Sequence, residues 1–277
     1  MRDIPFHQMP YKDFTIQGYS RAAVQTFWRI PEFHLGFDLG VQPWSFMGTE
    51  RWFLSHAHLD HMTMLPNYIA RRRMMKMTPP QIFLPAKNVR AVEAMLNAWS
   101  MLDRSEFPCE LIGMEPGESV RISRELSVEA FPTFHRIPSL GYVVSHHKKK
   151  LLPELLSLTG EEIRQRKEAG LPIDHEIVTP LLAYLGDSNA MGLDRNPIFY
   201  QTEVLIREVT FVEDAHWNMD DRHGHMHLND VVQRQEKFQN QLIIASHFTT
   251  RSSSKTIQHC VEEKLPDMLG GRLKLWL

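Results

Sequence analysis

His56-Ala57-His58-Leu59-Asp60-His61 is the stretch that decides the fold of this chain. It follows the apolar run Trp52-Phe53-Leu54, so we expect a buried strand that delivers three imidazoles and one carboxylate into a single loop. His56 and His58 alternate onto one side of an extended segment, and a turn after Leu59 directs Asp60 and His61 toward a second position nearby. Imidazole and carboxylate without thiolate suit Zn²⁺ or Mn²⁺ in a hydrolytic site better than a structural zinc. The loop therefore predicts ligands for two metal ions.

The composition is that of a globular protein. With 277 residues, 43% of them hydrophobic, the chain can bury the core of one large domain or two small ones. The net charge of −2 argues against a generally basic nucleic-acid surface, so a polyanion site would need a local concentration of Lys and Arg. Two cysteines, Cys109 and Cys260, cannot build a disulfide framework, which favours a reducing, cytoplasmic location. No stretch resembles an export signal or a membrane span, so we expect neither.

Strand and helix patterns alternate along the chain. The expected strands are 33–40, 52–55 and 81–85, then a meander over 110–145, and finally 181–185, 203–206 and 241–245; the expected helices are 65–77 and 88–102. The Arg71-Arg72-Arg73 run in the first helix predicts a solvated face. Buried strands whose ends meet at one crevice suit an α/β fold of the αβ/βα sandwich type.

Segment 146–178 differs in composition from its surroundings and reads as an inserted arm. It begins with Lys148-Lys149-Lys150 and continues with a helix pattern over 151–158. Thr159 would cap a second helix, with Glu162 three positions on, and that helix carries Arg164, Arg166 and Lys167. An ordinary surface helical hairpin explains the composition equally well.

Three residues at later strand ends would complete a two-metal hydrolase. His135 joins His56 and His58 at the first ion, and His247 joins Asp60 and His61 at the second. Asp187 is the expected bridge, because one carboxylate has two oxygens and its charge offsets two cations. The ions would lower the pKa of a shared water toward neutrality, and Asp60 can orient the resulting hydroxide.

A general acid for an alkoxide leaving group must come from elsewhere in the chain. Glu208 and His225 form the expected unit, in which the carboxylate fixes the imidazole tautomer and stabilises the imidazolium. The stretch from His223 to His227 is also compatible with a third metal site or with an exposed loop.

The motifs together resemble a known family. The His56 to His61 loop resembles the metal-binding motif of the metallo-β-lactamase superfamily, and its order with His135, Asp187 and His247 is similar to that of ribonuclease Z, the endonuclease family that removes the 3′ trailer of precursor tRNA. Phe134 to Tyr142 resembles the family's third-ligand motif, 207–210 its His-Glu-Ala-Thr motif, and 246–251 the segment of the last metal histidine. Arg207 stands where that family has a histidine. The resemblance covers essentially the whole chain and is closest to the short form.

The resemblance implies one domain over 1–277, a four-layer αβ/βα metallo-β-lactamase sandwich with a helical arm over 146–178. It also implies two zinc ions, with Mn or Fe as alternatives, and a homodimer. In such a dimer each arm grips tRNA for the partner's active site. The arm's expected phosphate contacts are Lys148, Lys149, Lys150, Arg164, Arg166 and Lys167.

Three functions are therefore weighed. The first is a zinc-dependent endoribonuclease that cuts precursor tRNA just 3′ of the discriminator nucleotide, with Asp60, Glu208 and His225 as catalytic residues. The second is a small-molecule phosphodiesterase or other hydrolase of the same superfamily, with the arm as a lid. The third is a non-catalytic RNA-binding protein that retains a vestigial metal site.

Overall fold

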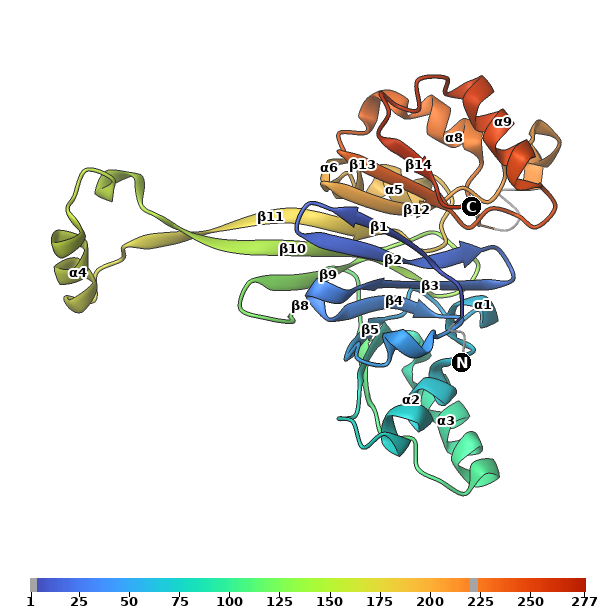
Figure 1. Cartoon of the computed structure of the whole chain (residues 1–277), viewed down its shortest axis with the longest axis horizontal. Helices are drawn as coiled ribbons and strands as arrows, with labels where there is room; N and C mark the ends of the chain where they lie inside the picture. The colour runs from blue at the N-terminus through green and yellow to red at the C-terminus, as the bar shows by residue number, and fades with distance from the viewer. Residues whose placement is uncertain (1–3, 220–223) are drawn as a thin grey trace.

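Two seven-stranded sheets face each other in the computed structural model, which describes residues 4–219 and 224–277 (Figure 1). The strands of the first sheet follow chain order: β1 His7–Tyr11, β2 Phe14–Arg21, β3 Gln25–Ile30, β4 Leu35–Leu39, β5 Arg51–Phe53, β6 Gln81–Pro85 and β7 Glu110–Met114. The second sheet contains β8 Ser119–Arg121, β9 Leu126–Pro132, β10 Leu140–Leu151, β11 Asp174–Tyr184, β12 Val204–Glu208, β13 Leu242–Ser246 and β14 Leu273–Leu275.

The two halves of the chain share one topology. In each sheet the first four strands pair antiparallel, and the last three join in parallel. The parallel strands β12 and β13 of the second sheet are buried along their whole length. This burial explains why those strands read as nearly continuous apolar runs in the sequence.

Helices cover the outer face of each sheet and complete four layers (Figure 1). The first sheet carries α1 Leu59–Met62, α2 Leu65–Met74 and α3 Val89–Asp103, and the second carries α5 Met191–Arg195, α6 Ile198–Gln201, α8 Leu228–Gln233 and α9 Ser254–Lys264. Short 3₁₀ helices are η1 Pro31–Phe33, η2 Trp44–Phe46, η3 Ala86–Asn88, η4 Pro153–Leu155, η5 Asp214–Met219 and η6 Gln235–Lys237. The expected αβ/βα sandwich is confirmed.

Apolar side chains fill the space between the sheets and beneath the helices. Phe37 and Phe53 of the first sheet meet Tyr142 and Tyr184 of the second in the central layer. Separate buried clusters join each sheet to its own helices. Burying an aromatic or aliphatic side chain of this size contributes about 1.5–3 kcal/mol each, so the sandwich rigidly supports the loops at its ends.

Most sequence expectations for regular elements are met, with two exceptions. Arg72 was expected on a solvated face, yet it is 1% exposed. Its guanidinium donates to the carbonyl oxygens of Met47, Thr49 and Thr78, which anchors α2 to the loops beneath it. The helix expected over 151–158 is also wrong, because β10 runs on to Leu151 and only η4 follows.

The segment 146–178 is drawn out as a long β-hairpin with a helix near its tip (Figure 1). Lys148-Lys149-Lys150 belongs to β10, where it pairs with residues 175–177 of β11. That pairing joins residues far apart in sequence, so the local helix pattern could not reveal it. The tip helix α4, Gly160–Glu168, begins with the expected capping box of Thr159 and Glu162. The hairpin leaves the sandwich on the side opposite α1, which contains Asp60 and His61 of the histidine loop (Figure 1).

No helix in the described part of the chain is long and apolar enough to cross a bilayer.

Candidate metal centre

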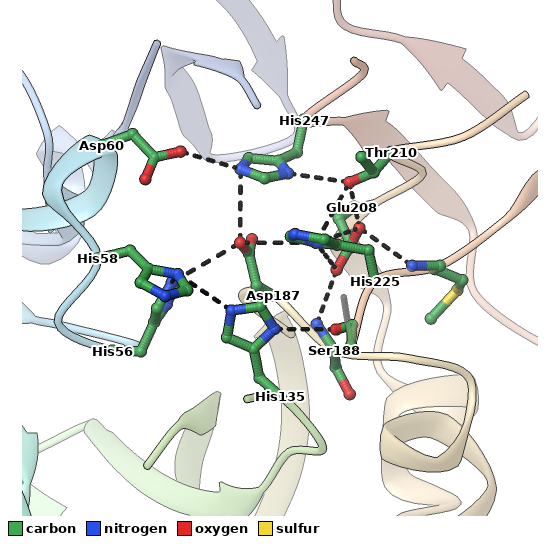
Figure 2. Close-up of polar contacts among 12 residues, drawn as sticks. His56, His58, Asp60, His135, Asp187, Ser188, Glu208, Thr210, His225 and His247 are labelled. Atoms are coloured by element: carbon green, nitrogen blue, oxygen red, sulfur yellow. Dashed lines mark hydrogen bonds and ion pairs between the residues drawn. The ribbon is translucent and has the colours of Figure 1, made fainter. Parts of the chain in front are cut away.

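The predicted site residues converge at one end of the sandwich, where strands from both sheets stop (Figure 2). The histidine loop follows β5, and His135 follows β9. Asp187 follows β11, Glu208 ends β12, and His247 follows β13. A cleft of about 340 Å³ opens there, and among the predicted site residues it is bordered by His58, Asp60, Asp187, His225 and His247. Its other walls come from Ala22, Ala23, Thr210, Phe211 and residues 249–251. Side chains as far apart in sequence as His61 and His247, 186 positions, thus lie together at strand carboxyl ends.

The first cluster consists of His56, His58, His135 and Asp187. His58 Nδ1 lies 3.0 Å from His56 Nε2 and 3.1 Å from His135 Nε2. Asp187 Oδ2 is 3.7 Å from His56 Nε2. Three ring nitrogens and a carboxylate oxygen therefore surround one point (Figure 2).

The second cluster consists of Asp60, His61 and His247. The Nε2 atoms of the two histidines are 3.2 Å apart. Asp187 Oδ2 lies 3.4 Å from His61 Nε2 and 3.5 Å from His247 Nε2. Asp187 thus stands between the two clusters, at the position expected of a bridging carboxylate.

Hydrogen bonds behind the histidines assign their protons. His135 Nδ1 donates to the carbonyl oxygen of Gly224 at 2.9 Å, and His61 Nδ1 donates to Asp38 at 2.7 Å. His247 Nδ1 contacts the Thr210 hydroxyl at 3.1 Å, and that hydroxyl is itself a donor to Glu208, so it accepts from the ring. Each ring therefore presents the lone pair of Nε2 to the clusters.

This arrangement fits metal ions. Lone pairs of His61 and His247 at 3.2 Å repel one another unless a proton or a metal ion lies between them. In the first cluster, His58 Nδ1 can donate a proton to only one of its two neighbouring ring nitrogens. Its contact with the other nitrogen is repulsive unless a cation lies between them. Nitrogen and oxygen donors held by outer hydrogen bonds are typical of catalytic Zn²⁺, Mn²⁺ or Fe²⁺ sites.

The charge states agree with metal binding. Burial lowers the pKa of His56 well below its usual value, so that ring stays neutral. Burial opposes the ionised form of Asp60, but the hydrogen bond to His247 and the charge of His61 outweigh it and lower the pKa of Asp60 to about 2. Burial also disfavours a charged His61, yet Asp187 and Asp38 raise the pKa of that ring well above its usual value. The carboxylates therefore attract positive charge to the second cluster.

Asp38 is a site residue that sequence reasoning missed. Its carboxylate is fully buried at the end of β4. It accepts hydrogen bonds from His61 Nδ1, from the backbone N–H of Ser55 at 2.6 Å, from the Ser55 hydroxyl at 2.8 Å and from the Tyr184 hydroxyl. Only its place at a strand end, in Asp38-Leu39-Gly40, could have indicated it.

The expected proton-donor pair lies beside the clusters (Figure 2). His225 Nδ1 donates to Glu208 Oε1 at 3.0 Å, which leaves Nε2 for a group in the cleft. Glu208 is held by the backbone N–H groups of Ser188 at 2.8 Å and Met226 at 3.2 Å, and by the Thr210 hydroxyl. Burial lowers the pKa of His225, but the charge and hydrogen bond of Glu208 raise it further, to about 9. Thr210 and Ser188 were not predicted from the sequence.

For the stretch from His223 to His227, a third metal site and an exposed loop were the other expectations, and the structure gives His227 a structural role. Its Nδ1 accepts from the backbone N–H of Asn229, and its Nε2 contacts the carbonyl oxygen of Glu213 at 3.0 Å, so it caps α8 and belongs to neither cluster. His223 lies outside the described residues. The arm side chains at 148–150 and 164–167 are remote from the centre, on the hairpin and its helix.

The fold and the site define the class. The chain matches the Beta-lactamase superfamily domain over residues 50–248. Among solved structures it resembles the metallo-β-lactamase fold protein YhfI from Bacillus subtilis, with a TM-score of 0.63, 12% identity, and 93% of this chain and 92% of that chain covered. It is also similar to human tRNase Z, short form, with a TM-score of 0.54, 17% identity, and 90% and 94% covered. These likenesses establish a metallo-β-lactamase fold.

Sequence relatives narrow the class to a family. The chain is 36% identical to tRNase Z TRZ1 of Arabidopsis thaliana over 268 residues, which cover 96% of this chain and 95% of the relative. It is 30% identical to the chloroplastic tRNase Z TRZ2 of the same plant, over 90% of this chain and 72% of the relative. This protein belongs to the tRNase Z, or ribonuclease Z, family of the metallo-β-lactamase superfamily. The resemblance inferred from the motifs is confirmed.

Proposed function

We propose that this protein is a metal-dependent endoribonuclease that removes the 3′ trailer of precursor tRNA. The observation that carries the proposal is the Glu208–His225 pair beside two clusters of metal-type ligands, in a chain whose near full-length relative is named tRNase Z. Phosphodiester hydrolysis with an alkoxide leaving group needs both parts: the cations and a proton donor.

Two divalent ions, which we propose to be zinc, would be held by the two clusters with Asp187 between them. The clusters also suit Mn²⁺ or Fe²⁺. When bound, such ions offset phosphate charge and make a water molecule acidic enough to attack near neutral pH. Asp60 is fixed for orienting that water, because its Oδ2 accepts from the backbone N–H of Ala23 at 2.8 Å. The β2–β3 turn therefore holds the histidine loop in place.

The leaving 3′ oxygen takes its proton from His225 Nε2 in this scheme. Glu208 holds the ring by Nδ1 and stabilises the imidazolium. Products are then a tRNA with a 3′-hydroxyl and a trailer with a 5′-phosphate.

The arm is the proposed tRNA grip, and its two faces differ. Over 146–178 the sequence carries six basic and six acidic side chains, so the arm as a whole is not basic. Strand register separates the charges: Lys148 and Lys150 lie opposite Ile177 and His175, whereas Lys149 lies opposite Glu176. Lys149 also pairs with Asp174 at 3.1 Å. We therefore assign phosphate contact to the face of Lys148 and Lys150.

The basic side chains of the tip helix α4 are less available for RNA than Lys148 and Lys150, because its two arginines have local partners. Arg164 pairs with Glu161 at 2.8 Å and lies 3.8 Å from Glu168. Arg166 donates to the Pro172 carbonyl oxygen at 3.3 Å. Lys167 is exposed on α4. Binding of RNA through Arg164 would have to compete with these local partners.

A homodimer is the proposed assembly. Twelve residues of β10 extend about 40 Å, and the hairpin leaves the sandwich away from its own metal centre, so the arm is placed to serve a second copy (Figure 1). Exposed apolar side chains on α2 and α3, namely Met74, Trp99, Met101 and Leu102, offer a surface for that copy. We name these four residues the α2–α3 patch.

We further propose a reducing compartment, in keeping with the free thiols of Cys109 and Cys260. The cytoplasm stays a prediction, since relatives are named as chloroplastic in Arabidopsis thaliana and nuclear in Triticum aestivum.

The test compares a double substitution of arm lysines with a single substitution of the lysine between them. Lys148→Ala with Lys150→Ala should raise KM for a precursor tRNA about 10-fold or more and flatten the salt dependence of log KM by about 2, because two phosphate contacts are lost. Lys149→Ala is the matched control and should change both much less, since that ammonium already pairs with Asp174. Hydrolysis of bis(4-nitrophenyl) phosphate should be unchanged in all variants. Equal loss on both substrates would favour the lid of a small-molecule phosphodiesterase.

A further inference from the structure

Arg207 is a buried cation next to the proton-donor pair, and neither metal binding nor packing explains it. It lies on β12, one residue before Glu208, with a fully buried guanidinium that is 1% exposed. No carboxylate lies within ion-pair distance of it in the described part of the chain. Its Nη1 has no hydrogen-bond partner. Burial lowers the pKa of Arg207 to about 10, while the charges of Asp230 and Glu208 raise it, so the group remains a cation at neutral pH.

The surroundings of Arg207 would suit an apolar residue. It borders a closed void with no room for a water molecule, lined by Val209, Leu228, Val231, Ala245, Phe248, Val261, Leu273 and Leu275. The guanidinium stacks over the Phe238 ring at 5.7 Å from the centroid. A methionine or leucine would fill this space without the cost of burying an unpaired charge.

The guanidinium contacts a backbone oxygen on one side of the proton-donor pair and a side-chain sulfur on the other. Its Nε donates to the carbonyl oxygen of Glu208 at 3.1 Å. Its Nη2 reaches the sulfur of Met226, the residue after His225. Met226 in turn donates its backbone N–H to the Glu208 carboxylate at 3.2 Å. Arg207 thus joins the end of β12 to the loop that carries His225.

We propose that Arg207 is a positioning residue for the proton transfer: it fixes the loop at Met226 against β12 so that His225 Nε2 faces the leaving oxygen. This proposal rests on the proposed function, because it assumes that His225 supplies the proton. The planar guanidinium reaches two directions at once, which lysine cannot do.

The experiment measures single-turnover cleavage of a precursor tRNA by metal-loaded Arg207→Met and Arg207→Lys variants. A displaced proton donor should lower kcat about 10- to 100-fold with KM and metal content unchanged. A precursor with sulfur in place of the leaving 3′ oxygen provides the decisive readout. A thiolate leaves without being protonated. On that substrate the variants should therefore have the same kcat as the unsubstituted protein.

Arg72→Met is the matched control, because Arg72 is equally buried and donates to backbone carbonyls and to the hydroxyls of Tyr68 and Thr78, none of which lines the cleft. It should lower the melting temperature and leave kcat unchanged. If Arg207→Met does not fold, Arg207→Lys decides: a kcat equal to that of the unsubstituted protein overturns the proposal. So does a loss that persists on the sulfur substrate, which would indicate general misfolding. Absence of precursor cleavage by the unsubstituted protein would instead refute the proposed function.

Discussion

Replacing Asp38 with asparagine is expected to weaken metal binding at the second cluster selectively. The asparagine has nearly the same shape, but it has one acceptor oxygen where Asp38 uses two, Oδ1 for the Ser55 N–H and Oδ2 for His61, Ser55 and Tyr184. His61 then faces a neutral amide in place of a carboxylate, so its proton is held less firmly on Nδ1. When the proton moves to Nε2, the lone pair needed by the metal is blocked.

The magnitude follows from the number and kind of bonds. Loss of an outer carboxylate behind a metal-bound histidine typically lowers metal affinity 10- to 100-fold, or about 1.4–2.8 kcal/mol. Hydrogen bonds to a charged group contribute about 1.5–3 kcal/mol each, and at least one donor is left buried without an acceptor, so the free energy of unfolding should fall by about 2–4 kcal/mol. Asp38 also joins the two sheets through Tyr184, which places the loss in the core.

The assay is competition for Zn²⁺ against a chelating indicator, with calorimetric unfolding of the same samples. The Asp38→Asn protein should show one site weakened 10- to 100-fold and the other, built on His56, His58 and His135, changed much less. Asp194→Asn is the matched control, because Asp194 pairs at the surface with Arg234 and Lys237. Its loss should reduce stability by no more than about 1 kcal/mol and leave both metal affinities unchanged. Two unaltered sites in Asp38→Asn, or loss confined to the first cluster, would refute the reasoning.

Three further variants probe the backbone beside Asp60, the tip of the arm and the α2–α3 patch. Gly40→Ala should reduce metal content and stability together, because a Cβ there would lie 1.8 Å from the Asp60 carbonyl oxygen, whereas Gly48→Ala, with nothing within 4 Å, should be neutral by the same metal analysis and melting curves. Thr159→Ala should speed amide exchange in α4, costing about 1 kcal/mol of local stability, and leave hydrolysis of bis(4-nitrophenyl) phosphate unchanged; unchanged exchange would contradict the capping role. Leu102→Glu in the α2–α3 patch should shift sedimentation toward a monomer and abolish precursor cleavage but spare the small substrate; a persistent dimer would rule out this surface.

The convergence of the candidate metal ligands was largely predictable from the sequence, because many of them are neighbours in the chain. Four of its seven residues occupy one hexapeptide, and strand patterns directly precede Asp187 and His247. Because parallel strands end at a common edge, placing each residue after a strand was enough to bring them together.

The residues that support the site could not be predicted, because their hydrogen-bond partners are far away in the sequence. Asp38 is 146 positions from Tyr184, and Thr210 is 37 positions from His247. The arm was misread as helical because its stability comes from pairing with β11 rather than from local preference. The role of Arg207 was also not predictable, because its position in an apolar run does not indicate that its guanidinium contacts Glu208 and Met226.

The measurement that tests the central claim most directly is the mapping of product ends from a precursor tRNA incubated with the metal-loaded protein. We expect a single cut just 3′ of the discriminator nucleotide, leaving a 3′-hydroxyl on the tRNA and a 5′-phosphate on the trailer. His225→Ala should slow that cut about 100-fold or more while the metal content stays unchanged. Cleavage that leaves a 3′-phosphate, or an intact precursor in a preparation that still hydrolyses small phosphodiesters, would contradict it.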